Sequence, residues 1–163
     1  MHAKKVAQVG MYVALAFVLS YLESLFPLSF AVPGIKLGLS NLVVMMGLYR
    51  FSVQTTFGIA IVRILLVGFT FGNLSSMIYS LAGGMFSFLV MVFLKKTNKF
   101  SVYGVSMAGG VCHNIGQIAV ASIILQTGLL VYYLPFLLVA GTVTGLLIGY
   151  VSGLLLKRTA DGL

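Results

Sequence analysis

Long apolar runs are the feature that most constrains how this chain can fold. Six can be drawn between turn-forming or basic residues, at approximately residues 6–26, 37–49, 52–71, 74–94, 102–125 and 129–156. A helix needs about 20 apolar residues to cross the hydrocarbon core of a bilayer. Only 7% of the residues are charged, against about 25% in an average soluble domain. The sequence therefore predicts a single all-α integral membrane domain, residues 1–163, whose surface faces lipid.

The basic residues predict how these runs are threaded. The second run is short, so its length alone also allows a re-entrant segment. Six crossings that start in the cytoplasm place on the cytoplasmic side Lys4, Lys5, Arg50, Lys95, Lys96, Lys99, Lys157 and Arg158. Of the basic residues, Lys36 alone then lies outside, which is the usual charge bias of membrane proteins. We therefore predict six transmembrane helices in the cytoplasmic (inner) membrane, with both termini inside.

The net charge of +8 has the same explanation. Basic residues at the ends of apolar runs serve topology and contact anionic lipid, so a nucleic-acid partner is not expected.

Arg63 lies near the middle of the third run, where a charge costs roughly 2.5–3.5 kcal/mol on insertion scales. The chain has only two acidic residues, Glu23 and Asp161. Asp161 follows the last run and belongs to the cytoplasmic tail. Two interpretations remain open. Arg63 pairs with Glu23 or with backbone carbonyls and ties helices together, or its counter-ion is an anionic ligand in an outward-facing cavity.

The fifth run carries a second polar group. His113 and Gln117 are four residues apart and share a helix face, and Asn114 is three from Gln117. This face either forms interhelical hydrogen bonds or contacts a ligand. Further polar residues are expected at similar depth, in the outer half of the membrane, where they could line one pocket with Arg63 and His113. The predicted ligand-binding residues are Arg63, His113, Asn114, Gln117, Asn41, Lys36, Glu23 and Tyr79.

The chain offers little material for catalysis. It has no Gly-rich phosphate loop and no Asp-rich pair for magnesium. One mid-membrane histidine and one cysteine, Cys112, are poor evidence for a metal. We therefore expect no catalytic residue, metal or cofactor, and not an enzyme. Any ATP-driven transport would need partner subunits.

Small residues recur at helical spacing in two places. The first run contains the pairs Ala3–Ala7 and Gly10–Ala14, and the last contains Gly141, Gly145, Gly149 and Gly153. Such stripes let helices approach backbone to backbone. Either stripe can serve packing inside the bundle or contact with a partner subunit.

Two stretches carry a family resemblance. They are residues 33–41 (PGIKLGLSN), followed by Leu48 and Tyr49, and residues 109–117 (GGVCHNIGQ). Through them nearly the whole chain resembles the bacterial membrane family called heptaprenyl diphosphate synthase component I, or Gx transporter family. That family in turn resembles the S components of energy-coupling factor (ECF) transporters.

The resemblance implies a fold and partners. S components are six-helix membrane proteins that bind vitamins or related solutes from outside, and they associate with a transmembrane coupling subunit and two cytoplasmic ATPases. In that group, small residues spaced by four on the first helix contact the coupling subunit. Both Ala3–Ala7 and Gly10–Ala14 match this spacing.

Three functions follow as hypotheses. The first is the S component of an ECF-type uptake transporter for a small, anionic, vitamin-like or isoprenoid-related solute. The alternative is a non-catalytic membrane subunit of a prenyl diphosphate (heptaprenyl) synthase or quinone biosynthesis complex. It is non-catalytic because prenyl synthases use aspartate-rich motifs that are absent here. A third is a channel or facilitator working alone, for which no pore signature is visible.

Overall fold

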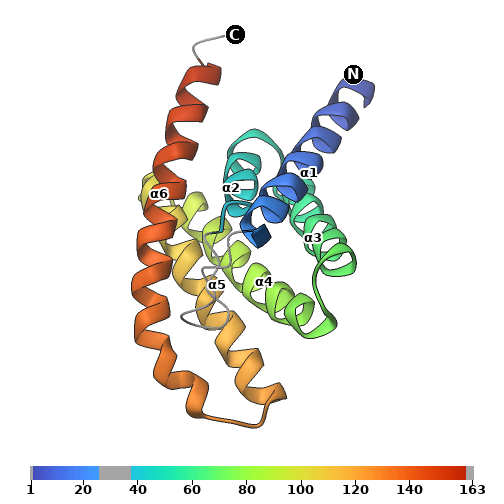
Figure 1. Cartoon of the computed structure of the whole chain (residues 1–163). Coiled ribbons are helices and arrows are strands. Elements are labelled where there is room, and N and C mark those ends of the chain that lie inside the picture. Colours follow the sequence, from blue (N-terminus) through green and yellow to red (C-terminus); the bar gives the residue numbers. More distant parts are fainter. Residues whose placement is uncertain (1, 26–37, 161–163) are drawn as a thin grey trace.

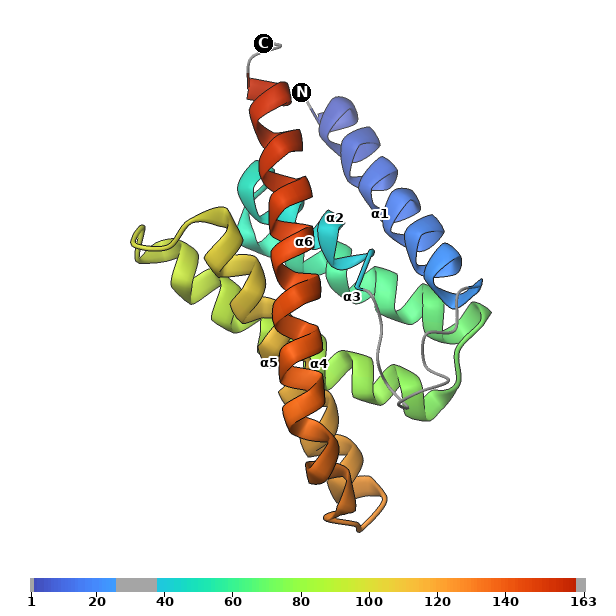
Figure 2. The same ribbon diagram turned by 60° about the vertical axis from the view of Figure 1, so that its left-hand side comes forward.

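The computed structural model describes residues 2–25 and 38–160, and this part of the chain is all helical (Figure 1). The elements are α1 (His2–Leu25), α2 (Asn41–Arg50), α3 (Val53–Thr70), α4 (Leu74–Lys96), α5 (Val102–Ile124), a 3-10 turn η2 (Leu129–Tyr133) and α6 (Leu134–Ala160). The predicted all-α class is confirmed for these residues. The N- and C-terminal ends of the bundle lie on the same side in both views (Figures 1 and 2).

Polar caps explain where several helices begin. Ser52 and Ser101 each accept a hydrogen bond from a backbone N–H in the first turn of α3 and α5, respectively. Asn73 begins α4 with a capping box. Its Oδ1 accepts from Ser76 N at 2.7 Å, and its own N–H donates to Ser76 Oγ at 3.0 Å. These bonds satisfy N–H groups that a helix start leaves unpaired.

Within the described residues, five helical segments are long and apolar enough to cross a membrane: Ala3–Leu25, Val53–Thr70, Leu74–Lys96, Val102–Ile124 and Leu129–Arg158. They match five of the six predicted runs to within a few residues. The chain is therefore a multi-pass membrane protein by the length and composition of its helices.

The second predicted run needs correction. A helix over 37–49 was expected, but α2 has only ten residues, Asn41–Arg50. At 1.5 Å per residue it is about 15 Å long, half of a typical hydrocarbon core of about 30 Å. The reason lies at its start, where Gly38 takes a left-handed conformation (φ 72°) that an α-helix cannot contain. The helix by itself is too short for a crossing.

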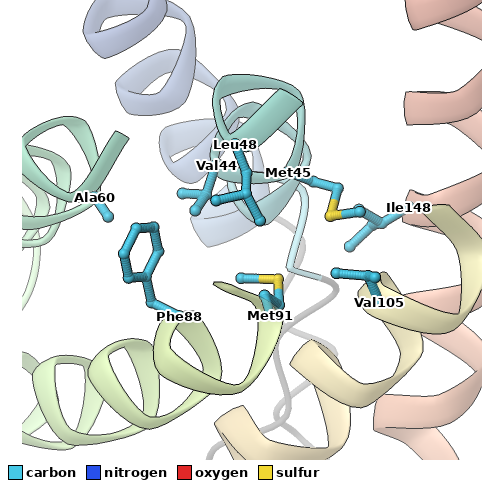
Figure 3. Packing of buried hydrophobic residues seen from close by; sticks show 8 residues of the cluster. All are labelled: Val44, Met45, Leu48, Ala60, Phe88, Met91, Val105 and Ile148. Carbon is cyan, nitrogen blue, oxygen red and sulfur yellow. The ribbon is translucent and has the colours of Figure 1, made fainter. Parts of the chain in front are cut away.

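The short helix α2 is nonetheless central to the packing. Val43 and Leu48 are fully buried. One apolar cluster joins five helices (Figure 3): Val44, Met45 and Leu48 of α2, Ala60 of α3, Phe88 and Met91 of α4, Val105 of α5 and Ile148 of α6. A second cluster joins Val43 to Tyr12 and Ala16 of α1 and Ile59 of α3. Lys95 of α4 donates to the Leu48 carbonyl oxygen at the end of α2.

The glycine stripe of α6 packs against α5 of the same chain. A Cβ added to Gly145 would lie 2.8 Å from Met107 Cα, and one added to Gly141 would lie 2.9 Å from the Gly110 carbonyl oxygen. A Cβ added to Gly149 would lie 2.9 Å from Tyr103 Cα, whereas one added to Gly153 would contact only the Tyr103 side chain, at 3.4 Å from its hydroxyl oxygen. Of the two interpretations left open, internal packing is the one that the structure shows for Gly141, Gly145 and Gly149. Contact of the stripe with a partner subunit stays a prediction.

Gly145→Ala should destabilise the protein by about 1–3 kcal/mol, because the new methyl group meets α5 backbone rather than a movable side chain. The measurement is thermal unfolding of the detergent-purified protein. Gly58→Ala is the matched control, since a Cβ there meets nothing within 4 Å. It should stabilise α3 by up to about 1 kcal/mol through helix propensity. Equal effects at the two positions would contradict the close contact.

Candidate ligand-binding site

A cavity of about 410 Å³ opens among the helices. Its walls come from the C-terminal end of α1, the start of α2, the middle of α3, and one face each of α4, α5 and α6. The polar residues that line it are Ser20, Glu23, Ser24, Ser40, Asn41, Arg63, Asn73, Ser76, Ser80, Ser87, Ser106, His113, Asn114 and Thr144. Met45, Met91 and Ile148, which Figure 3 shows in the core cluster, form part of its apolar floor.

Arg63 is the buried cation of this cavity, with 7% of its surface exposed. Its Nη1 donates to Ser40 Oγ, and to Asn41 Oδ1 at 3.4 Å. Its Nε is buried and has no hydrogen-bond partner. These bonds tie the middle of α3 to the start of α2. They leave part of the guanidinium's donor capacity unused by the described residues.

Glu23 reaches the same site from α1. Its Oε1 accepts a hydrogen bond from the backbone N–H of Gly38. It also interacts with Arg63 through the electrostatic field, but the hydrogen bonds of Arg63 go to Ser40 and Asn41. Glu23 therefore anchors the backbone at Gly38, just before α2, and it also interacts electrostatically with Arg63, as one of the two open interpretations expects.

The polar face of α5 divides between the cavity and its neighbours. His113 and Asn114 line the cavity. Asn114 Nδ2 also donates to the Leu137 carbonyl oxygen of α6 at 2.7 Å, so it forms one of the interhelical hydrogen bonds considered for this face. Gln117 lies against Gly83 of α4. It is not among the residues that line the cavity.

The remaining predicted site residues fall elsewhere. Tyr79 of α4 is half-buried and does not line the cavity. Lys36 lies outside the described residues. The structure thus brings together Arg63, Asn41, Glu23, His113 and Asn114 from four different helices.

The predicted site residues include none of the serine or threonine hydroxyl groups of the cavity, although Ser76 is among the polar residues expected in the outer half. Ser76, Ser80 and Ser87 of α4 all line it. Their spacings of four and seven residues place them on one helix face, and this pattern was readable in the sequence. Thr144 of α6 had no comparable signal in the sequence. In the structure its hydroxyl donates to the Ala140 carbonyl of its own helix at 2.9 Å.

The described lining combines hydroxyl, amide and charged side chains, a chemistry suited to holding a polar ligand. Of the described lining residues, Glu23 is the one carboxylate and Arg63 the one permanent cation. Among the described residues, no group of three metal-ligating side chains lies together. Many hydroxyl and amide groups surround a single buried cation, as in pockets that orient a polar ligand.

The small residues of α1 face away from the bundle. Ala3, Ala7, Gly10 and Ala14 are all exposed, and a Cβ added to Gly10 meets nothing within 4 Å. This exposed small-residue face of α1 is thus unlike the α6 stripe, which is covered by α5.

A multi-helix membrane protein with an internal polar cavity is the class that this fold and site define. Comparison with protein families narrows the class. The model of the family named heptaprenyl diphosphate synthase component I matches residues 12–155. The chain belongs to this family, and the predicted resemblance is confirmed. No curated protein and no solved structure matches the chain.

Gly38→Ala should cost about 1–2 kcal/mol of stability, since a residue with a Cβ is strained in the left-handed region. The added methyl group would also lie 3.3 Å from Ile148 Cδ1 at the edge of the cavity. Thermal unfolding would measure the loss. Gly128→Ala is the control, because Gly128 has φ −80° and open space around it. A neutral Gly38→Ala would show that the left-handed turn is dispensable.

Proposed function

We propose that this chain is the substrate-binding membrane subunit, or S component, of an ECF-type ATP-driven uptake transporter. Its solute is small and anionic, either vitamin-like or related to a short isoprenoid. The observation that carries the proposal is Arg63, buried at the wall of a 410 Å³ cavity with Nε unpartnered. A buried charge is costly unless it is fully paired, and an anionic solute would supply the missing partner.

The size of the cavity supports a small solute. Ligand pockets typically have volumes of about 300–1,000 Å³. The cavity lies at the small end of this range, which suits a vitamin precursor or a short isoprenoid better than a full heptaprenyl chain.

Six crossings with both termini in the cytoplasm remain part of the proposal. In it, the chain crosses the membrane for the second time at α2. The end of α1, the start of α2 and the start of α4 then meet at the outer face, and all three line the cavity. His113, Asn114 and Thr144 lie near the middle of their helices. The cavity would therefore run from the outer face to mid-membrane, as uptake requires.

The proposed partners are a transmembrane coupling subunit and two cytoplasmic ATPases. Because the chain has no phosphate-binding loop of its own, ATP hydrolysis falls to the ATPases. The exposed small-residue face of α1 is the proposed contact for the coupling subunit, since small side chains allow another helix to approach closely.

The alternative is a non-catalytic membrane subunit of a prenyl diphosphate synthase or quinone biosynthesis complex. The family name favours it, because a component I implies further components. Co-purification from native membranes distinguishes the two: a coupling subunit with ATPases supports the transporter, and a soluble prenyl synthase supports the alternative.

A thermal-shift screen tests for the solute. Vitamins, their precursors and short isoprenoid diphosphates are added separately to the detergent-purified protein. A true ligand at 100 times its Kd should stabilise the folded state by about 2.7 kcal/mol. The shift should disappear in Arg63→Gln and persist in Arg158→Gln, which changes an exposed arginine. A ligand that stabilises Arg63→Gln equally would remove Arg63 from the site.

Ala7→Leu combined with Ala14→Leu tests the partner contact. The larger side chains should block close approach to α1 and lower co-purification of the coupling subunit at least tenfold. The solute-induced thermal shift should not change, because both residues face away from the cavity. Ala119→Leu, at an exposed alanine of α5, is the control. If it reduces co-purification as much, α1 is not the contact.

A further inference from the structure

The guanidinium of Arg63 uses only one of its nitrogens for hydrogen bonds to the described chain. Nη1 donates to Ser40 and Asn41. Neither Nε nor Nη2 donates to any described residue, and Nε is fully buried. The Nε–Nη2 edge is the planar, two-donor side of the group, and its geometry matches the two oxygens of a carboxylate.

We propose that the solute binds through a single carboxylate, held by both donors of this edge beside the first turn of α2. This inference rests on the proposed function in taking the cavity as the solute site, and it narrows the chemical class of the solute. The ligand is a monocarboxylate with a polar body, not a diphosphate.

The start of α2 adds a second attraction for an anion. Ser40 is the N-cap of α2, but its side chain makes no capping hydrogen bond to the helix. Its Oγ instead accepts from Arg63. The N–H groups of Asn41, Leu42 and Val43 are bonded to the carbonyls of residues 38–40, so this end of α2 adds its dipole, rather than free donors, to the charge of the guanidinium.

The charge balance of the cavity argues against a polyanion. The described lining residues carry one permanent positive charge, at Arg63, and one carboxylate, at Glu23. A diphosphate carries at least two negative charges and would meet one guanidinium and the field of Glu23. A carboxylate brings one negative charge and two acceptor oxygens, which is what the Nε–Nη2 edge can satisfy.

The rest of the cavity suggests the body of the ligand. Ser80 and Ser87 of α4 and Ser106 of α5 present hydroxyl groups as donors or acceptors, and Met91 provides an apolar contact. Of the described lining residues, those of α4, α5 and α6 include no Asp, Glu, Lys or Arg. This wall suits a neutral, hydroxylated or heterocyclic moiety.

The test uses the small number of arginines in the chain. Arg50, Arg63 and Arg158 are the only three, so a protein labelled with ¹⁵N-arginine gives three Nε–Hε signals, assignable with Arg50→Lys and Arg158→Lys. Benzoate is titrated as the carboxylate probe. Benzamide is the neutral match of the same shape, and inorganic pyrophosphate is the polyanion.

The proposal expects the Arg63 signal to move with benzoate in a saturating manner. It should move at least tenfold less with benzamide or pyrophosphate at equal concentration. Arg63→Lys keeps the charge but loses the planar edge. Its affinity for benzoate, measured from the thermal shift, should be at least tenfold lower. Arg50→Lys and Arg158→Lys should bind benzoate normally.

Two outcomes would overturn the inference: an Arg63 signal that benzoate leaves in place, or one that responds to pyrophosphate more strongly than to benzoate. Equal binding of benzoate by Arg63→Lys would do the same. None of these results would affect co-purification with a coupling subunit and ATPases. The S-component proposal would then stand with a solute of another class, so the two failures are distinguishable.

Discussion

The buried guanidinium of Arg63 is the constraint on which the arrangement of the first three helices depends. Arginine keeps its charge in proteins, so an interior position requires polar groups to be brought to it. Ser40 and Asn41 provide them from the start of α2, and Glu23 holds the preceding Gly38 from α1. The start of α2 is therefore fixed by polar contacts to two other helices, while apolar contacts bury Val43, Val44, Met45 and Leu48 further along it.

The other three helices are held together by a different interaction. Glycines let α5 approach α6 at Gly110 and Gly141, and let it approach α4 at Gly83 and Gly116. In both places an added Cβ would meet backbone atoms of the neighbouring helix at less than 3 Å. Contacts this close leave no room for side chains, so α4, α5 and α6 form a tightly packed unit. The cavity lies between this unit and the polar junction of α1, α2 and α3.

This division gives the cavity its chemical character. The α1–α3 side contributes the charged groups, Arg63 and Glu23, and the α4–α6 side contributes hydroxyl, amide and imidazole groups. A ligand between them would contact both sides at once. Its charge would be recognised on one side and its polar body on the other, which is the division of roles that the proposed uptake of an anionic solute needs.

The sequence by itself determined the class of the protein and the extent of its long helices. Apolar runs with few charges exclude a water-exposed surface. Three of the helices begin after a capping residue, Ser52, Asn73 or Ser101, because a side-chain oxygen there accepts from an N–H group that the helix start leaves free. The family followed from two short motifs. The sequence also singled out Arg63, His113, Asn114, Asn41 and Glu23 as polar groups at unfavourable depth, and all five line the cavity.

Only the tertiary structure decided which of these groups meet and what they do. The spacing of Gln117 from His113 could not show that both lie against Gly83 while, of the two, His113 also lines the cavity. The hydrogen-bond partner of Arg63 was equally open, because the sequence does not show whether Glu23 or Ser40 lies beside it. In the fold, Glu23 accepts a hydrogen bond from the Gly38 N–H, and Ser40 accepts one from Arg63. The two small-residue stripes look alike along the chain. One is covered by α5 and the other is exposed, because helix spacing defines a face but not the neighbour that the face meets.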